Sequence, residues 1–181
     1  MLLVLGAAAA ALGACGGGSK KEAAVLRASP AKRSSGRHEQ VRLNLTLSNP
    51  GHAPITVSTS VRGTLQVVSL ERNGKPMLPR HSFLQTYESL GVLVGATLRK
   101  IPAGGSLALS FTSNFDQGAR GQAFYSVRPG RLKNPLEVYS VTAPGRYVLK
   151  LQDQYLAGAK PSSTTFTGPT NVATVSFDVV P

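Results

Sequence analysis

The sequence predicts an all-β domain in which two antiparallel sheets pack as a single sandwich. Short segments alternate apolar and polar residues with the period of two that a half-buried strand requires. Turn-forming residues separate these segments, and the 181-residue chain holds 19 glycines and 12 prolines. Seven or more such segments can be recognised, which favours a sandwich over a barrel.

The first half of the domain holds three predicted strands. The first is residues 41–48, where the sequence VRLNLTLS alternates strictly and then meets the turn sequence Asn-Pro-Gly. The second begins at Ile55, and the third, rich in valine and leucine, covers residues 65–72. Asn73-Gly74 then predicts a tight hairpin, because both residues tolerate positive φ.

The second half continues with a strand at 96–101, which the sequence Pro-Ala-Gly-Gly at 102–105 closes. Three further strands alternate around apolar rows, the middle one opening after Pro-Gly and the last covering 172–180. These rows are Leu107, Leu109 and Phe111, then Tyr147, Leu149 and Leu151, then Val175, Phe177 and Val179.

The first 14 residues are uninterruptedly apolar or small, which is typical of the apolar region of a signal peptide. As a helix they would span only ~21 Å, short of the ~30 Å bilayer core. The tetrapeptide Leu12-Gly13-Ala14-Cys15 resembles the lipobox of bacterial lipoprotein signals. That resemblance implies a lipid on the Cys15 thiol and cleavage just before it.

The alternatives at this end are an ordinary secretory signal with an incidental cysteine, or a buried strand. Cys15 is the only cysteine in the chain, so it forms no internal disulfide, and Gly16-Gly-Gly-Ser follows it as a flexible start. The absence of a basic residue before the apolar run departs from the signal pattern. Gly16 is not the aspartate that retains lipoproteins at the inner membrane, so a Gram-negative source implies the outer membrane, facing the periplasm.

Residues 15–39 are expected to form a lipidated, basic and flexible tether, with the folded domain at 40–181. Six basic residues stand against two acidic ones between 16 and 39, broken by serine, proline and glycine. The tether would either hold the domain near an anionic bilayer or act as a plain spacer.

The chain carries 20 basic and 8 acidic residues, a formal charge of +12. This surplus favours anionic partners, and its simplest interpretation is a solvated basic surface near an anionic membrane. Nucleic acid is not expected, because the basic residues are scattered, tryptophan is absent and no binding motif occurs.

The segment 112–143 is too long for a simple turn, and loops of this length are often functional. Residues 123–127 and 136–141 are expected to form the arms of a hairpin. A candidate partner-binding loop, for an acidic envelope protein or an anionic glycan, would use Tyr125, Arg128, Arg131, Lys133 and Tyr139. The alternative is an ordinary hairpin with a solvated tip. A second loop at 157–170 is rich in glycine, serine, threonine and proline.

No enzyme, cofactor or metal site is predicted. His38, His52 and His81, even together with Met77, match no metal-ligand spacing, although histidine and thioether groups suit copper. The Gly-x-Ser-x-Gly motif of serine hydrolases is absent, and the acidic residues are few and far apart.

The order of these signals, Leu-x-Leu-x-Leu-Ser-Asn-Pro, Asn-Gly-Lys, Ile-Pro-Ala-Gly-Gly-Ser-Leu and Ala-Pro-Gly-Arg-Tyr-Val-Leu, resembles bacterial immunoglobulin-like modules of the intracellular-proteinase-inhibitor type. The resemblance covers about residues 41–151 and implies an immunoglobulin-like sandwich. Tyr147 resembles a tyrosine whose hydroxyl pins a neighbouring turn, and a core aromatic is the alternative. An antibody-type core is excluded, because the chain has no cysteine pair and no tryptophan.

The function expected is therefore a membrane-anchored envelope lipoprotein, a non-enzymatic binding or structural module. The alternative is a protease-inhibitor-like module that presents loops to a peptidase. Asn49-Pro50, Gly104-Gly105 and Arg128-Pro129 faintly resemble the loops of chagasin-like inhibitors, although Gly130 stands where those have an aromatic residue. The inhibitor hypothesis requires these three turns to lie at one end of the domain.

Overall fold

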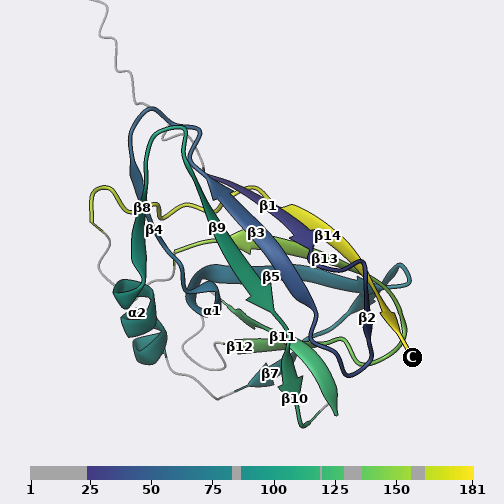
Figure 1. The fold of residues 1–181 in the computed structure, drawn as a ribbon. Helices are drawn as coiled ribbons and strands as arrows, with labels where there is room; N and C mark the ends of the chain where they lie inside the picture. The colour runs from purple at the N-terminus through teal and green to yellow at the C-terminus, as the bar shows by residue number, and fades with distance from the viewer. Residues whose placement is uncertain (1–23, 83–86, 119, 129–135, 156–161) are drawn as a thin grey trace, which may run out of the picture.

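The computed structural model describes residues 24–82, 87–118, 120–128, 136–155 and 162–181. Within them the chain forms fourteen strands and two helices (Figure 1). The predicted signal peptide and Cys15 lie outside the described residues.

Two sheets form the sandwich. The first has three antiparallel strands, in the order β1 (Val25–Pro30), β3 (Arg42–Ser48) and β9 (Ser106–Thr112). The second has five, in the order β2 (Ser34–Gly36), β14 (Ala173–Val180), β13 (Gly145–Asp153), β5 (Leu65–Arg72) and β6 (Lys75–Met77). Only the β2–β14 pair among these is parallel.

This strand order confirms the expected immunoglobulin-like sandwich. The strands β1, β3 and β9 take the positions of A, B and E, and β5, β13 and β14 take those of C, F and G. The Tyr147 hydroxyl donates a hydrogen bond to the Ala143 carbonyl, at 2.8 Å, at the corner that leads into β13. Tyr147 therefore pins its turn, as the resemblance implied, and burial raises the pKa of its phenol.

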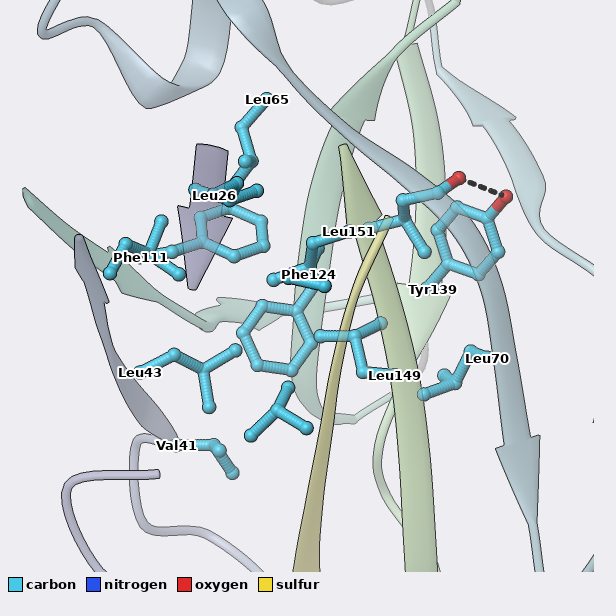
Figure 2. Close-up of a cluster of buried hydrophobic side chains, with 14 of the residues drawn as sticks. Leu26, Val41, Leu43, Leu65, Leu70, Phe111, Phe124, Tyr139, Leu149 and Leu151 are labelled. Carbon is cyan, nitrogen blue, oxygen red and sulfur yellow. Dashed lines mark hydrogen bonds between the residues drawn. The ribbon is translucent and has the colours of Figure 1, made fainter. Parts of the chain in front are cut away.

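The core lies between the sheets and consists of the inward positions of the alternating strands (Figure 2). An aromatic chain runs through it: the Phe111 and Phe124 ring centroids are 4.9 Å apart, and Phe124 lies 6.1 Å from Phe177. Phe177 then stacks on Tyr147 at 5.5 Å. Phe124, on the predicted hairpin arm 123–127, is fully buried.

Two additions surround the sandwich. A two-stranded ribbon at the upper left of Figure 1 pairs β4 (Ile55–Ser58) with β8 (Leu98–Ile101), beside the helices α1 (Val61–Thr64) and α2 (Tyr87–Ala96). A four-stranded sheet in the lower part has the order β10 (Asn114–Asp116), β11 (Gly121–Val127), β12 (Leu136–Ser140) and β7 (Arg80–Ser82). The sequence did not predict α2. Ala96, which was expected to begin a strand, is the last residue of this helix, and the strand begins at Leu98.

The prediction of a flexible tether over residues 15–39 is wrong for residues 24–39. This stretch contains β1 and β2, so the folded domain begins by Ala24 rather than at residue 40. Ala24 and Leu26 are each only 1% exposed and belong to the main core. The Leu26 backbone exchanges two hydrogen bonds with the Asn171 side chain, at 2.7 and 3.0 Å, which fastens β1 to the segment before β14.

Candidate functional site

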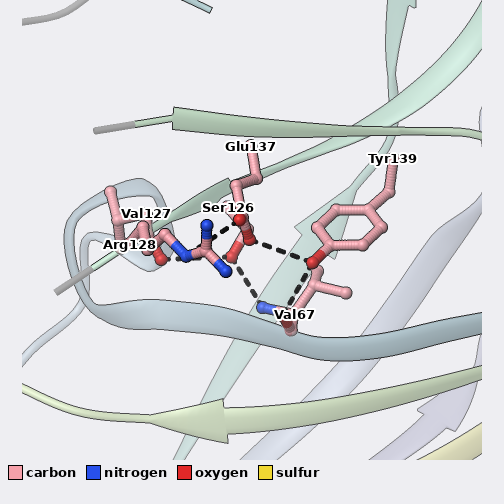
Figure 3. Close-up of polar contacts among 6 residues, drawn as sticks. All are labelled: Val67, Ser126, Val127, Arg128, Glu137 and Tyr139. Atoms are coloured by element: carbon pink, nitrogen blue, oxygen red, sulfur yellow. Dashed lines mark hydrogen bonds and ion pairs between the residues drawn. The ribbon is translucent and has the colours of Figure 1, made fainter. Parts of the chain in front are cut away.

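The expected hairpin forms within 112–143, where β11 and β12 pair from Ala123 opposite Ser140 to Val127 opposite Leu136. Tyr125 is half-buried in β11. The other members of the candidate loop are divided: Arg131 and Lys133 lie outside the described residues, and Arg128 and Tyr139 face an internal polar network (Figure 3).

Tyr139 belongs to the core and is no part of an exposed binding surface. It is 5% exposed, and its hydroxyl lies 3.0 Å from Glu137 Oε2 and 3.3 Å from the Val67 carbonyl oxygen. Burial raises the pKa of the phenol, and the Glu137 carboxylate raises it further. The inclusion of Tyr139 among the exposed contacts is therefore corrected. The sequence LEVYS gives no alternation that could have shown this, because four of the five residues of β12 are buried.

Arg128 neutralises a buried carboxylate. Its Nε lies 3.0 Å from Glu137 Oε1; the Glu137 side chain is 6% exposed and that of Arg128 42%. Beside this pair the Ser126 hydroxyl accepts a 2.6 Å hydrogen bond from the Val67 backbone N–H (Figure 3). A charge that compensates Glu137 inside the fold is less available to an acidic partner, so the network fastens the hairpin to β5.

A second buried carboxylate lies where β13 ends. Asp153 is 5% exposed, and the Thr64 hydroxyl donates to its Oδ2 at 2.7 Å. Burial raises the pKa of Asp153 to about 6, although the hydrogen bond from Thr64 lowers it. Thr170 closes the cluster, because its Oγ1 accepts the Asp153 backbone N–H at 3.0 Å. The contact ties α1 and the segment before β14 to β13.

Two of the three inhibitor-like turns meet, and the third does not join them. The Asn49 N–H donates to the Gly105 carbonyl at 2.9 Å, and the Asn49 side chain donates to the Pro102 carbonyl at 3.1 Å. Arg128 instead follows β11. Figure 1 shows the β3–β4 and β8–β9 connections at the top and the β11–β12 hairpin in the lower part. Two of the three turns that the inhibitor hypothesis requires are therefore brought together, and Pro129 of the third lies outside the described residues.

Seven cations lie at the end of the sandwich opposite the turns of Asn49 and Gly105. We call this the basic end. Backbone hydrogen bonds bring the segments that carry these cations together. In the turn after β1, the Ala31 N–H donates to the Arg42 carbonyl at 2.9 Å. The Asp178 N–H donates to the Arg33 carbonyl at 2.8 Å, and Asp178 is opposite Arg146 in the sheet. The cations of the basic end are Lys32, Arg33, Arg37, Arg42, Arg72, Lys75 and Arg146.

The β5–β6 hairpin completes the basic end. Asn73 and Arg146 exchange hydrogen bonds of 2.8 and 2.9 Å, which places Arg72 and Lys75 beside Arg146. The acidic residues among these segments are Glu39, Glu71 and Asp178, and seven positive charges against three leave a net charge of +4. Glu39 forms an ion pair with Lys32, which holds the pKa of the carboxyl below its usual value.

The sequence did not predict the basic end, because several of its members were assigned to a tether. Among the described residues, ion pairs engage Lys32 but none of Arg33, Arg42 and Arg146. All three side chains are exposed. The same described residues hold no group of three or more histidine, cysteine or acidic side chains that could bind a metal ion. No helix in this part of the chain is long and apolar enough to cross a bilayer.

No protein-family model and no curated protein matches the chain. Among solved structures, it is similar to the CARDB domain of PF1109 from Pyrococcus furiosus, with a TM-score of 0.35 and 11% identity over 88% of this chain and 97% of that one. The alkylpurine DNA glycosylase AlkC from Pseudomonas fluorescens gives a TM-score of 0.38 and 10% identity over 87% of this chain and 31% of that one. The β-glucosidase EmGH1 from Erythrobacter marinus gives 0.39 and 10%, over 87% and 16%. Similarities at this level assign no function.

Proposed function

We propose that the chain is a lipid-anchored, non-enzymatic binding module of a bacterial cell envelope. The observation that carries the proposal is Cys15, the only cysteine, at the end of the lipobox-like sequence Leu12-Gly13-Ala14-Cys15. An exported protein with one thiol has no internal disulfide to make from it, whereas lipid attachment uses it. An extracytoplasmic sandwich is also a common scaffold for presenting binding surfaces.

The beginning of the fold supports a position close to the membrane. The first strand starts at Val25, so residues 16–24 separate Cys15 from β1. Nine extended residues span at most about 30 Å. A lipid on Cys15 would therefore hold the sandwich within roughly its own diameter of the bilayer surface. The basic residues at 24–39 are part of the folded domain and would not act as a loose membrane-binding leash.

The polar interior supports a binding role over a catalytic one. Glu137 and Asp153 are buried carboxylates of the kind that could serve as acid or base, yet each holds strands together. Glu137 is engaged by Arg128 and Tyr139, and Asp153 by Thr64. A general acid or base must reach a substrate proton, whereas these groups face the protein interior. The exposed chemistry of the described residues is cationic, and suits recognition.

Intact mass and membrane fractionation of the full-length protein test the proposal, in a bacterial host that processes lipoproteins. The wild type should begin at Cys15, carry a diacylglycerol-sized mass increment and partition with membranes. Cys15→Ser should lack the increment and leave the membrane fraction, whereas the nearby Ser19→Ala should behave as the wild type does. An unmodified, water-soluble wild type, or one that retains Met1, contradicts the proposal.

A further inference from the structure

The basic end extends over both sheets of the sandwich. Arg42 begins β3 in the first sheet, and Arg146 lies on β13 in the second. Their neighbours Leu43 and Tyr147 are buried, so Arg42 and Arg146 point away from the core on the outer faces of two sheets that pack about 10 Å apart, and one small anion cannot bridge them. The turn that carries Lys32 and Arg33 leads from one sheet to the other and fills the interval with positive charge. A ligand that contacts the whole basic end must itself be extended.

The chemistry of the basic end favours an anionic polymer over a folded protein. Five of its seven cations are arginines, whose planar guanidinium groups bind phosphate and carboxylate through paired hydrogen bonds. Protein interfaces usually bury an apolar or aromatic centre. Among the described residues, Val180 is the exposed large apolar side chain that the strand register places here, opposite Gly36.

The basic end lies across the sandwich from the point at which the chain enters the fold. The chain enters the fold at Val25, at one end of β1, and the basic end starts just after Pro30, at the other end. A strand of six residues is ~20 Å long, so the cations lie across the length of the sandwich from the anchored segment.

We propose that the basic end binds an anionic glycan polymer whose successive sugars carry phosphate or carboxylate groups. The proposal deepens the binding role proposed above by naming its partner class and surface. It does not require a lipid on Cys15. The basic end can therefore bind the polymer even if Cys15 carries no lipid, and Cys15 can carry a lipid even if the basic end binds no polymer.

The test measures binding of the full-length protein, purified in detergent, to two probes across a range of salt concentrations. Polygalacturonate supplies carboxylates, and teichoic acid supplies phosphates. Neutral dextran and vesicles containing anionic lipid are the comparison ligands. Binding to at least one polyanion, with an affinity that falls steeply with salt and no binding to dextran, is the expected result.

Two triple variants, matched in charge, decide whether the basic end is the site. Three arginines of the basic end, all exposed, are replaced in Arg33→Gln, Arg42→Gln and Arg146→Gln. Three exposed cations outside it are replaced in Arg27→Gln, Arg99→Gln and Lys100→Gln. The first variant should bind at least about tenfold more weakly, and its slope of log affinity against log salt should fall by about 2. The second should stay within about threefold of the wild type, because its charges lie elsewhere.

Several results would overturn the proposal. Equal losses in the two variants would show that binding follows net charge rather than a site. Tighter binding to anionic vesicles than to either polymer would assign the surface to a membrane. If neither polygalacturonate nor teichoic acid binds at about 0.1 M salt, anionic glycan polymers are excluded as the partner. Thermal unfolding of each variant, expected to match the wild type because the substituted side chains are exposed, separates lost binding from lost folding.

Discussion

Replacing Asp153 by asparagine tests whether the fold keeps a carboxyl group in its interior at a cost in free energy. Asp153 is 5% exposed, and Thr64 Oγ1 donates to it at 2.7 Å. Burial disfavours the ionised form and raises the pKa from 3.8 to about 6. An asparagine side chain has nearly the same shape, and its oxygen can accept the same hydrogen bond from Thr64. It cannot ionise.

The magnitude follows from the difference between the folded and unfolded pKa values. Because the folded chain has the higher pKa, it binds the proton more tightly than the unfolded chain does. Asp153 therefore imposes no cost below about pH 4, and its cost grows as the pH rises through about 6. A difference of about 2 pKa units corresponds to roughly 3 kcal/mol above pH 7, at ~1.4 kcal/mol per unit.

Urea unfolding of the wild type and Asp153→Asn, from pH 4 to pH 8, measures this cost. The two proteins should have similar free energies of unfolding near pH 4. The variant should then gain stability relative to the wild type as the pH rises, by about 3 kcal/mol at pH 8. Asp178→Asn, the same replacement at an exposed position, is measured beside it.

The diagnostic quantity is the change with pH in the difference between variant and wild type. A difference that is independent of pH, or one that turns in favour of the wild type above pH 6, would refute the reasoning. The carboxyl would then be solvated in the folded chain, or held ionised by a stronger partner than Thr64.

Three further substitutions test the packing. Leu26→Ala should lower the free energy of unfolding, measured with urea, by about 2–5 kcal/mol because β1 lines the core. The exposed Arg27→Ala should change it by less than about 0.5 kcal/mol. Equally small effects of the two substitutions would show that β1 is not part of the folded core. Tyr147→Phe should cost about 1 kcal/mol in thermal unfolding, since it removes one hydroxyl hydrogen bond and keeps the ring; no loss would mean that the corner contributes nothing. Arg128→Met should lower the free energy of unfolding by about 3 kcal/mol because it leaves the buried Glu137 without its cation. Adding Glu137→Gln should restore much of this loss. A double variant as unstable as the single one would contradict the ion-pair argument.

The strands that the sequence predicted well are those with strict alternation of large apolar residues. Leu65–Arg72 agrees with β5 at both ends, and the rows on β9, β13 and β14 point inward as expected. Tyr147 was also predictable, because a tyrosine after Pro-Gly marks a recurring corner of this fold. In each case a local pattern and the tertiary structure agree.

The beginning of the domain could not be predicted for a physical reason. β1 alternates around the small residues Ala24 and Ala28, with cations and serines between and after them, so its apolar signal is weak. Its strand conformation comes from pairing with β3 over six residue pairs and from the Asn171 side chain, 145 positions away from Leu26. Composition alone favoured a tether.

The basic end was missed for the same reason. Its cations come from four separate stretches of the chain, which become neighbours through the placement of β1 and β2 and through the pairing of β5 with β6 and β13. The candidate loop drew attention instead because its charges are adjacent in sequence. In the structure Arg128 pairs with the buried Glu137, and Tyr139 is buried in the core.

The position of the last strand governs when the fold can close. β14 lies inside the five-stranded sheet, between β2 and β13, and contributes Val175, Phe177 and Val179 to the core. Its final residues pair with a strand that begins at Ser34, so the sheet is incomplete until residues 173–180 are available. A chain still emerging from a ribosome lacks this strand until residues 173–180 are released, and its sheet stays open until then. We expect deletion of residues 173–181 to abolish cooperative refolding by circular dichroism, and a truncated chain that still refolds would show that the sandwich closes without its C-terminus.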